Sequence, residues 1–495
     1  MLGRSTVHTD LGEIRGRAHD GYHSFRGIRY AQAPVGERRF APPVPVEPWD
    51  QPIDATAYGA SAPQPSQREG NPLPGREIRW DEDCLFLNIF TPAPDDARRP
   101  VLFWIHGGAY TAGSGDAYHG GPFATHGDIV VVTVNYRLGV FGFMELGHLD
   151  PSLAGSQNNG IRDQIAALQW VHDHIERFGG DPDQVTICGE SAGAGSVAAI
   201  LGAPTADHLY HRAIAQSPPV SFAPTTTDTA DRFLERVGGF DRLRSADPAD
   251  LVDAQVAAST AEMAAREPIL LGVPGGGLRP SLDDHTVTRH PVEAVRALGP
   301  QAKPLMVGTN SDEGTLFAFY LMHDVDDSQL YTAVAAHCTD PDRVIAAFRA
   351  EYPGEDNRRL MRRMLTDTMF RTGALELADA QTDARGDVFV YLFSWASQGF
   401  GGRLGAMHAL EIPFVWDGDL DAWSQIMGEG RPWPDDLSAR MHHAWIGFVR
   451  DGDPSHAGIG EWPRYDTDRR PTMEFGDTSQ VLEDPGRALR EAWRP

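Results

Sequence analysis

One stretch of the chain, residues 185–195, constrains the fold more than any other. Its sequence, Val-Thr-Ile-Cys-Gly-Glu-Ser-Ala-Gly-Ala-Gly, predicts a short β-branched strand that turns sharply into an alanine-rich helix. Ser191 lies at the turn, with a glycine two residues away on either side. Such a turn strains the serine backbone, and larger flanking side chains would clash with neighbouring elements. The pattern is typical of a nucleophilic serine, although a purely structural turn serine also fits these residues alone.

The segments around this turn alternate between buried strands and amphipathic helices. Continuous apolar runs at residues 101–105 and 129–134 are typical of strands that are buried on both faces. Between residues 160 and 178, apolar side chains recur every three or four positions, which indicates a helix with one buried face. Further strands are expected at residues 185–188, 213–216, 304–308 and 388–393. The alternation predicts an α/β protein with a large, mostly parallel central sheet flanked by helices.

The other segments are expected to extend or cover this sheet. The first hundred residues are rich in Pro, Gly and Arg, and short alternating segments such as 12–16 predict antiparallel hairpins at one edge. Residues 221–300 and 320–385 are polar and mainly helical in pattern. Because they lie between core strands, we expect capping insertions there and a single domain spanning residues 1–495.

Charge and composition exclude several classes of partner. The chain of 495 residues has a formal net charge of −26, whereas binding to nucleic acid or anionic membranes needs a basic surface. We find no run of about 18 apolar residues and no apolar core of a secretory signal near the start. We therefore expect a cytoplasmic protein that binds neither nucleic acid nor membrane. Lys303 is the single lysine, a bias that we attribute to a GC-rich bacterial genome.

The cysteines favour a reducing compartment. Cys84, Cys188 and Cys338 are odd in number and far apart in sequence. This spacing fits neither a disulfide framework nor a zinc site with closely spaced ligands.

Eight motifs, in order along most of the chain, resemble those of the type-B carboxylesterase/lipase family, which includes bacterial para-nitrobenzyl esterases and animal cholinesterases. They occupy residues 25–36, 82–88, 104–110, 135–143, 178–182, 189–193, 308–314 and 405–408. The resemblance implies the α/β-hydrolase fold, in which Gly-x-Ser-x-Gly between strand and helix carries the nucleophile. It also implies hydrolysis of small-molecule carboxylic esters, with no metal or organic cofactor.

An esterase of this kind needs a nucleophile, a base and a group that orients the base. With Ser191 as the nucleophile, the α/β-hydrolase order of serine, acid and histidine places the base after the acid. His408 stands in the family's Gly-x-x-His motif, whereas His442 and His443 fit by order alone. An imidazole that titrates near neutrality can accept the serine proton and return it to the leaving alcohol.

The acid is expected in the loop after the strand near residues 305–308. Glu313 and the adjacent Asp312 are both candidates from position alone. The family places glutamate second in its Asp-Glu-Gly motif, so the resemblance selects Glu313. Its role would be to fix the tautomer of His408 and to stabilise the imidazolium.

The resemblance also implies an oxyanion hole formed by the amides of Gly108, Ala109 and Ala192. The family often has a third glycine where this chain has Ala109. Alanine keeps its backbone N–H, so we expect no loss of activity from this difference.

Other positions near the motifs are expected to support the site. Glu190 is expected to be buried and to hold water or a neighbouring hydroxyl, with Ser217 as a partner by resemblance; a purely structural role for both is the alternative. Secreted eukaryotic relatives carry a cysteine where this chain has Ala62, so Cys84 lacks that partner and no disulfide is expected.

Two further functions fit part of the sequence. The same residues can hydrolyse a carbamate, lactone or amide in place of an ester. A non-catalytic binding module of the same fold is the third hypothesis, and it is disfavoured because the serine, acid and histidine are all present.

Overall fold

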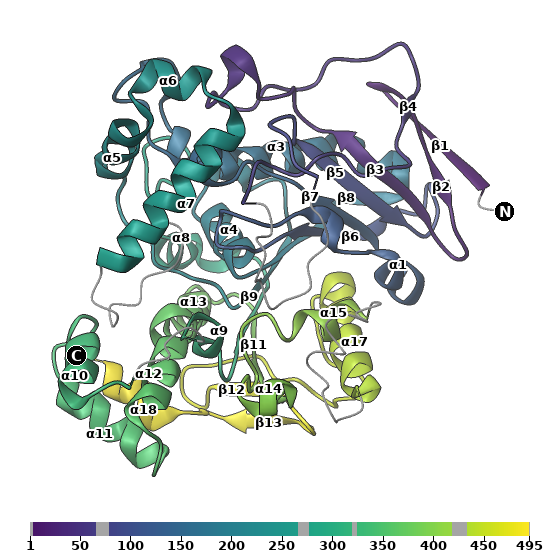
Figure 1. Cartoon of the computed structure of the whole chain (residues 1–495). Helices are drawn as coiled ribbons and strands as arrows, with labels where there is room; N and C mark the ends of the chain where they lie inside the picture. The colour runs from purple at the N-terminus through teal and green to yellow at the C-terminus, as the bar shows by residue number, and fades with distance from the viewer. Residues whose placement is uncertain (1–2, 66–78, 266–276, 319–323, 418–432, 495) are drawn as a thin grey trace.

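The computed structural model describes residues 3–65, 79–265, 277–318, 324–417 and 433–494. One large sheet runs through the molecule (Figure 1). Its strands are β1 (Gly3–Thr9), β2 (Gly12–Ala18), β3 (His23–Arg29), β4 (Ile53–Asp54), β5 (Phe86–Thr91), β6 (Arg99–Ile105), β7 (Val130–Val134), β8 (Gly180–Glu190), β9 (Arg212–Gln216), β10 (Leu305–Asn310), β11 (Val388–Phe393), β12 (Pro471–Phe475) and β13 (Ser479–Glu483).

The order of the strands is β1-β2-β3-β5-β7-β6-β8-β9-β10-β11-β12-β13, with β4 paired to β2. From β7 to β12 every neighbouring pair is parallel. At one end, the pairs β1-β2, β2-β3, β3-β5 and β5-β7 are antiparallel, whereas β4 pairs parallel with β2; at the other end, β12 pairs antiparallel with β13. The predicted α/β fold with a mostly parallel sheet is confirmed, as are antiparallel strands near the amino terminus. Strand β13 was not predicted, because its residues are mostly polar and exposed.

Strand β6 shows why the central strands are apolar throughout. Val101, Phe103 and Ile105 belong to the core on one face of the sheet, and Leu102 and Trp104 belong to the core on the other. Successive side chains of a strand point to opposite faces, so a strand covered on both sides needs apolar residues at every position. All five side chains are buried.

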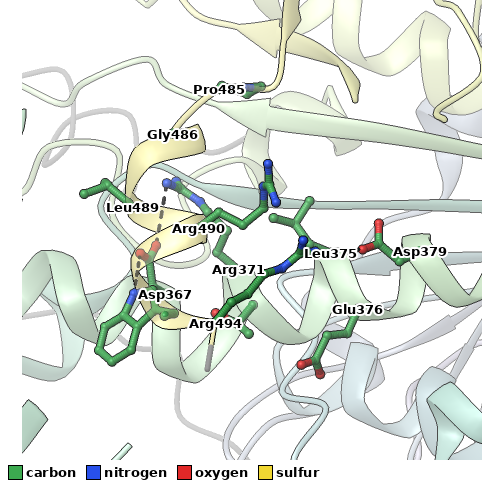
Figure 2. Close-up of a pocket in the computed structure, with 12 residues that line it drawn as sticks. Asp367, Arg371, Leu375, Glu376, Asp379, Pro485, Gly486, Leu489, Arg490 and Arg494 are labelled. Carbon is green, nitrogen blue, oxygen red and sulfur yellow. Dashed lines mark hydrogen bonds and ion pairs between the residues drawn. The ribbon is translucent and has the colours of Figure 1, made fainter. Parts of the chain in front are cut away.

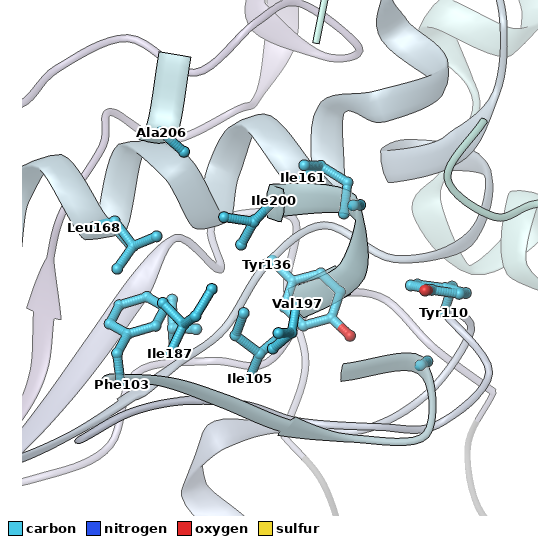
Figure 3. Packing of buried hydrophobic residues seen from close by; sticks show 14 of the residues in the cluster. Phe103, Ile105, Tyr110, Tyr136, Ile161, Leu168, Ile187, Val197, Ile200 and Ala206 are labelled. Carbon is cyan, nitrogen blue, oxygen red and sulfur yellow. The ribbon is translucent and has the colours of Figure 1, made fainter. Parts of the chain in front are cut away.

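Helices α3 (Asn159–His174) and α4 (Ala192–Leu201) cover the first of these faces. Figure 3 shows Phe103 and Ile187, from neighbouring strands, beneath Leu168 of α3 and Ile200 of α4, with Val197 of α4 beside Ile105. This packing fixes the axis of α4, whose first residue follows Ser191.

The predicted insertions are helical. Between β9 and β10 lie α5 (Asp228–Val237), α6 (Phe240–Ser245), α7 (Pro248–Ala265) and α8 (Pro291–Leu298); between β10 and β11 lie α9 (Gly314–Ala318), α10 (Asp327–Ala335), α11 (Pro341–Glu351), α12 (Asn357–Thr366) and α13 (Thr372–Asp383). In Figure 1, α5, α6 and α7 gather on one side, while α10, α11 and α12 form a second group with the carboxy-terminal α18 (Arg487–Trp493). That the chain forms a single domain stays a prediction.

A third group consists of α1 (Gly121–Gly127), α15 (Ile412–Trp416) and α17 (Asp435–Asp451). Figure 1 shows these helices side by side, and α17 contacts both of the others. Phe123, Trp416 and Trp445 join them to the second face of the sheet. Two further short α-helices in the described residues are α2 (Gly139–Phe143) and α14 (Gly399–Gly402). Among the helices that the structure describes, none is long and apolar enough to cross a membrane.

Candidate active site

Ser191 occupies a strained turn between β8 and α4. Its φ of 56° and ψ of −124° are unusual for a residue with a side chain, and its N–H donates to the Gln216 carbonyl at 2.9 Å. A Cβ added at Gly189 would lie 2.5 Å from the carbonyl carbon of Gly193, and one added at Gly193 would overlap the Ile105 carbonyl oxygen. The predicted sharp turn is therefore present, and backbone packing explains both glycines.

His408 lies between Ser191 and Glu313. Its Nε2 is 2.7 Å from Ser191 Oγ, and its Nδ1 is 2.5 Å from Glu313 Oε2. With Nδ1–H donating to the carboxylate, the lone pair of Nε2 faces the serine hydroxyl. The histidine and glutamate side chains are 4% and 0% exposed. This arrangement can transfer a proton from the hydroxyl to the imidazole.

The topology explains how residues so far apart in sequence meet. Ser191 follows β8, Glu313 follows β10, and His408 lies between β11 and α15. These strands are parallel and lie close together in the order β8-β9-β10-β11. Their carboxyl ends share one edge of the sheet, where ligand sites of open α/β sheets form.

The other oxygen of Glu313 is also fixed. Glu313 Oε1 accepts hydrogen bonds from the Asn310 N–H at 2.7 Å and from Ser217 Oγ at 2.5 Å. Sequence reasoning offered Ser217 as a partner of Glu190, and the structure places its hydroxyl on Glu313. A carboxylate held by both oxygens presents a fixed orientation to His408.

Glu190 is a second carboxylate beside the imidazole. Its Oε1 lies 3.2 Å from His408 Nε2, and its side chain is 4% exposed. Burial raises the pKa of Glu190 to about 8. Burial also opposes charging of His408, but the Glu190 and Glu313 carboxylates outweigh it and raise the pKa of His408 to about 9. The predicted burial of Glu190 is confirmed, and its contact is with the imidazole.

A third buried carboxylate, Glu411, was missed by sequence reasoning. Its oxygens accept hydrogen bonds from Asn310 Nδ2 at 2.7 Å and Gln216 Nε2 at 3.1 Å. Burial raises the pKa of Glu411. In the sequence, Glu411 can be recognised by its position, three residues after His408 and directly before the apolar run 412–416.

The surroundings of Asp312 differ from those of its neighbour. Asp312 Oδ2 accepts a hydrogen bond from the Ala406 N–H at 3.0 Å, and Oδ1 lies 3.2 Å from Arg363 Nη1. Its carboxylate is thus engaged by a backbone amide and a guanidinium group. Of the two acids left open by position, Glu313 is the one that reaches His408.

The other two candidate bases face elsewhere. His442 Nδ1 lies 2.8 Å from the Val415 carbonyl, and the exposed His443 has its Nδ1 2.7 Å from the Ala439 carbonyl. Both histidines belong to α17. Order along the chain does not distinguish these two histidines from His408 as candidate bases, whereas their positions in the fold do.

The turn at residues 107–109 lies against Ser191. A Cβ added at Gly107 would be 3.1 Å from Ser191 Cβ. Gly108 and Ala109 both have positive φ, 114° and 54°, which turns the backbone sharply at this point. Ala192 is the first residue of α4, so its N–H has no acceptor within the helix. Amides from two elements therefore border the serine, an arrangement suited to an oxyanion.

Two phenylalanines pack on the imidazole. The rings of Phe370 and Phe317 lie 4.5 Å and 5.1 Å from the His408 ring, measured between centroids. Apolar contact on this side keeps water from the ring and fixes its plane.

A pocket elsewhere in the molecule has a different character. Figure 2 shows this cavity of about 150 Å³ between α13 and α18, with Asp367 and several arginines around it. Its guanidinium groups are paired with carboxylates: Arg371 with Asp367, Arg490 with Asp484 and Arg494 with Asp379. The cavity wall includes none of Ser191, Glu313 and His408. Its charge is balanced internally, so it gives no reason to expect an anionic ligand.

Comparison with known proteins identifies relatives over nearly the whole chain. The model of the carboxylesterase family matches residues 3–491. The para-nitrobenzyl esterase of Bacillus subtilis is 36% identical over 99% of this chain and 98% of its own length. The phenmedipham hydrolase of Pseudarthrobacter oxydans is 35% identical over 96% of each chain.

Solved structures agree with this result. A carboxylesterase from Geobacillus stearothermophilus superposes with a TM-score of 0.86 at 35% identity, covering 99% of this chain and 100% of its own. A para-nitrobenzyl esterase structure gives the same TM-score and identity, with full coverage of both chains. The α/β-hydrolase architecture, the order of the motifs and these relatives lead to one conclusion. The chain belongs to the carboxylesterase family.

Proposed function

We propose that the protein hydrolyses carboxylic esters through an acyl-enzyme intermediate on Ser191. The observation that carries this proposal is the continuous contact from Ser191 Oγ to His408 Nε2 and from His408 Nδ1 to Glu313 Oε2. The relatives named as esterases support the reaction class.

In the first half of the reaction, Ser191 Oγ attacks the ester carbonyl while His408 Nε2 takes its proton. The Glu313 carboxylate stabilises the imidazolium and remains ionised. The N–H groups of Gly108, Ala109 and Ala192 donate to the oxyanion, and one such donor contributes roughly 3 kcal/mol to transition-state stabilisation. His408 then gives the proton to the departing alcohol.

In the second half, His408 removes a proton from water, and the resulting hydroxide attacks the acyl group on Ser191. The oxyanion is held by the same amides, and collapse of the intermediate releases the carboxylic acid. Neither half needs a metal or an organic cofactor. Glu190 lies 3.2 Å from Nε2, where its ionised form favours the imidazolium.

The test is the Ser191→Ala variant with para-nitrophenyl acetate as substrate. We expect kcat to fall by at least about 10⁴-fold while far-UV circular dichroism stays unchanged. A matched Ser217→Ala variant keeps the nucleophile and should lose far less. A Ser191→Ala enzyme within tenfold of the wild type would reject the nucleophile.

The second candidate reaction is hydrolysis of a carbamate, lactone or amide at the same serine. A relative named phenmedipham hydrolase supports testing phenmedipham directly. Comparing kcat/KM for phenmedipham and for para-nitrophenyl esters decides between the two: a higher value for phenmedipham would reassign the substrate class. A cytoplasmic location is also proposed, and the free thiols of Cys84, Cys188 and Cys338 support it.

A further inference from the structure

Three side chains from three helices meet at one point outside the proposed catalytic cluster. His126 lies in the last turn of α1, Asp417 caps the carboxyl end of α15, and His442 lies within α17. His126 Nδ1 is 3.3 Å from His442 Nε2 and 3.5 Å from Asp417 Oδ2. One ligand atom from each residue lies within 4.8 Å of the other two. We propose that these three residues bind a divalent cation of the zinc class.

Two of the three separations match the edges of a metal coordination sphere, and the third is at most 4.8 Å. Ligands bound to zinc at about 2.0–2.1 Å in tetrahedral geometry lie about 3.3–3.4 Å apart. The two distances from His126 Nδ1 are close to that value. Two imidazoles and one carboxylate suit zinc and its transition-metal neighbours, whereas calcium and magnesium prefer oxygen ligands. A site with three protein ligands leaves a fourth position for water.

In two of the proposed ligands, His442 and Asp417, the side-chain atom that faces away from His126 is held by a hydrogen bond. His442 Nδ1 lies 2.8 Å from the Val415 carbonyl, which requires a proton on Nδ1 and leaves the lone pair of Nε2 facing His126. Asp417 Oδ1 accepts a hydrogen bond from Ser438 Oγ at 3.1 Å, while Oδ2 faces His126. Metal-binding histidines and carboxylates are held by partners of this kind.

Hydrogen bonds among the three residues do not pair all three facing atoms with one another. His442 Nε2 and Asp417 Oδ2 are both acceptors, and both lie near the same nitrogen, Nδ1 of His126. One proton on that nitrogen can serve only one of them well. A single cation at the centre satisfies all three lone pairs.

The cluster combines a buried base with an open entrance. His442 is 0% exposed and packs against the ring of Phe123, whereas the side chains of His126 and Asp417 are 47% and 36% exposed. An ion can therefore reach the ligands from solvent. Its charge is partly balanced by the Asp417 carboxylate, and the protein carries a large net negative charge.

A bound ion would join α1, α15 and α17. Helix α15 directly follows the segment that carries His408 and Glu411, so the ion would also anchor the end of that segment. This differs from the expectation of no metal site. Closely spaced ligands are the pattern that predicts a zinc site from sequence, whereas His126 and His442 are 316 residues apart.

The test uses untagged full-length protein that has been stripped with EDTA and dialysed, titrated with ZnCl2 by isothermal calorimetry. We expect one Zn²⁺ per chain for the wild type. We expect at least tenfold weaker binding for His126→Ala and for Asp417→Asn. His443→Ala is the matched control, because it removes the exposed histidine next to His442 on α17, which contributes no ligand atom to the cluster, and it should bind like the wild type.

Substitution with Co²⁺ gives a second readout. Tetrahedral Co²⁺ with nitrogen and oxygen ligands has visible absorption bands, which should appear in the wild type and disappear in His126→Ala. Circular dichroism in EDTA checks that each variant is folded. Absence of Zn²⁺ binding by the wild type, or equal affinity in the wild type, His126→Ala and Asp417→Asn, would overturn the proposal.

Discussion

The clusters at His408 and at His442 both combine histidine with a carboxylate, and they differ in what faces the imidazole. At His408, a carboxylate lies on Nδ1 and a serine hydroxyl on Nε2, so a proton can move along the line. At His442, a backbone carbonyl lies on Nδ1 and a second imidazole on Nε2, so two lone pairs converge. The same residue types therefore suit proton transfer in one place and metal binding in the other. The partner atoms decide the chemistry.

The largest expected effect on the serine cluster comes from replacing Glu313, the carboxylate on His408 Nδ1. We expect Glu313→Gln to lower kcat/KM for para-nitrophenyl acetate by about 10³–10⁴-fold, because an amide cannot stabilise the imidazolium and favours the wrong tautomer. Asp312→Asn is the matched control, since Asp312 contacts Arg363 and the Ala406 amide and not the imidazole. A greater loss in Asp312→Asn than in Glu313→Gln would reverse the assignment.

The strained turn separates the two clusters in a second way. Only the serine cluster depends on close backbone packing, and a Cβ at Gly193 would overlap the Ile105 carbonyl oxygen. We expect Gly193→Ala to destabilise the fold by about 1–3 kcal/mol and to reduce kcat by more than tenfold. Gly195→Ala is a less informative change, because its Cβ would meet side-chain atoms of Tyr110 and Pro219 and not a backbone carbonyl. Urea unfolding and initial rates measure both effects, and wild-type values for Gly193→Ala would refute the packing argument.

The second carboxylate at His408 predicts a pH effect. Neutral His408 is the active base, and the Glu190 charge raises the pKa of His408, so activity should be lost as pH falls through a value above the ordinary 6.5. In Glu190→Gln the raised pKa relaxes downward, and the acid limb of kcat/KM should move to lower pH by roughly one unit. A limb that stays in place or moves upward would contradict this role of Glu190.

The smallest expected effect concerns the three-helix cluster. If Zn²⁺ binds His126, Asp417 and His442 in the folded state, saturating Zn²⁺ should raise the melting temperature of the wild type by about 2–5 °C relative to EDTA. The shift should be absent in His126→Ala and preserved in His443→Ala. Equal shifts in all three proteins would show that the stabilisation arises elsewhere.

The sequence predicted the features that depend on neighbouring residues. The turn at Ser191 and the helix after it follow from local glycine and alanine positions, and the buried strands follow from continuous apolar runs such as residues 101–105. Motif order then selected His408 and Glu313 by resemblance, and the structure places His408 against Ser191 and Glu313 against His408.

What was missed depends on contacts between distant segments. Position could not separate Asp312 from Glu313, because the difference comes from Arg363 and Ala406, which lie far along the chain. Ser217 reaches Glu313 from the end of β9, 96 residues away. Strand β13 is a polar edge strand whose pairing is fixed by β12 and not by an apolar pattern of its own.

The central claim is that Ser191 is the nucleophile, and covalent labelling tests it most directly. The protein is treated with diethyl para-nitrophenyl phosphate, and the adduct is located by intact-mass and peptide mass spectrometry while residual esterase activity is followed. We predict one diethylphosphoryl group per chain, on Ser191, formed in proportion to the loss of activity. Complete inactivation with the group on another residue, or full labelling of Ser191 with activity retained, would contradict the account.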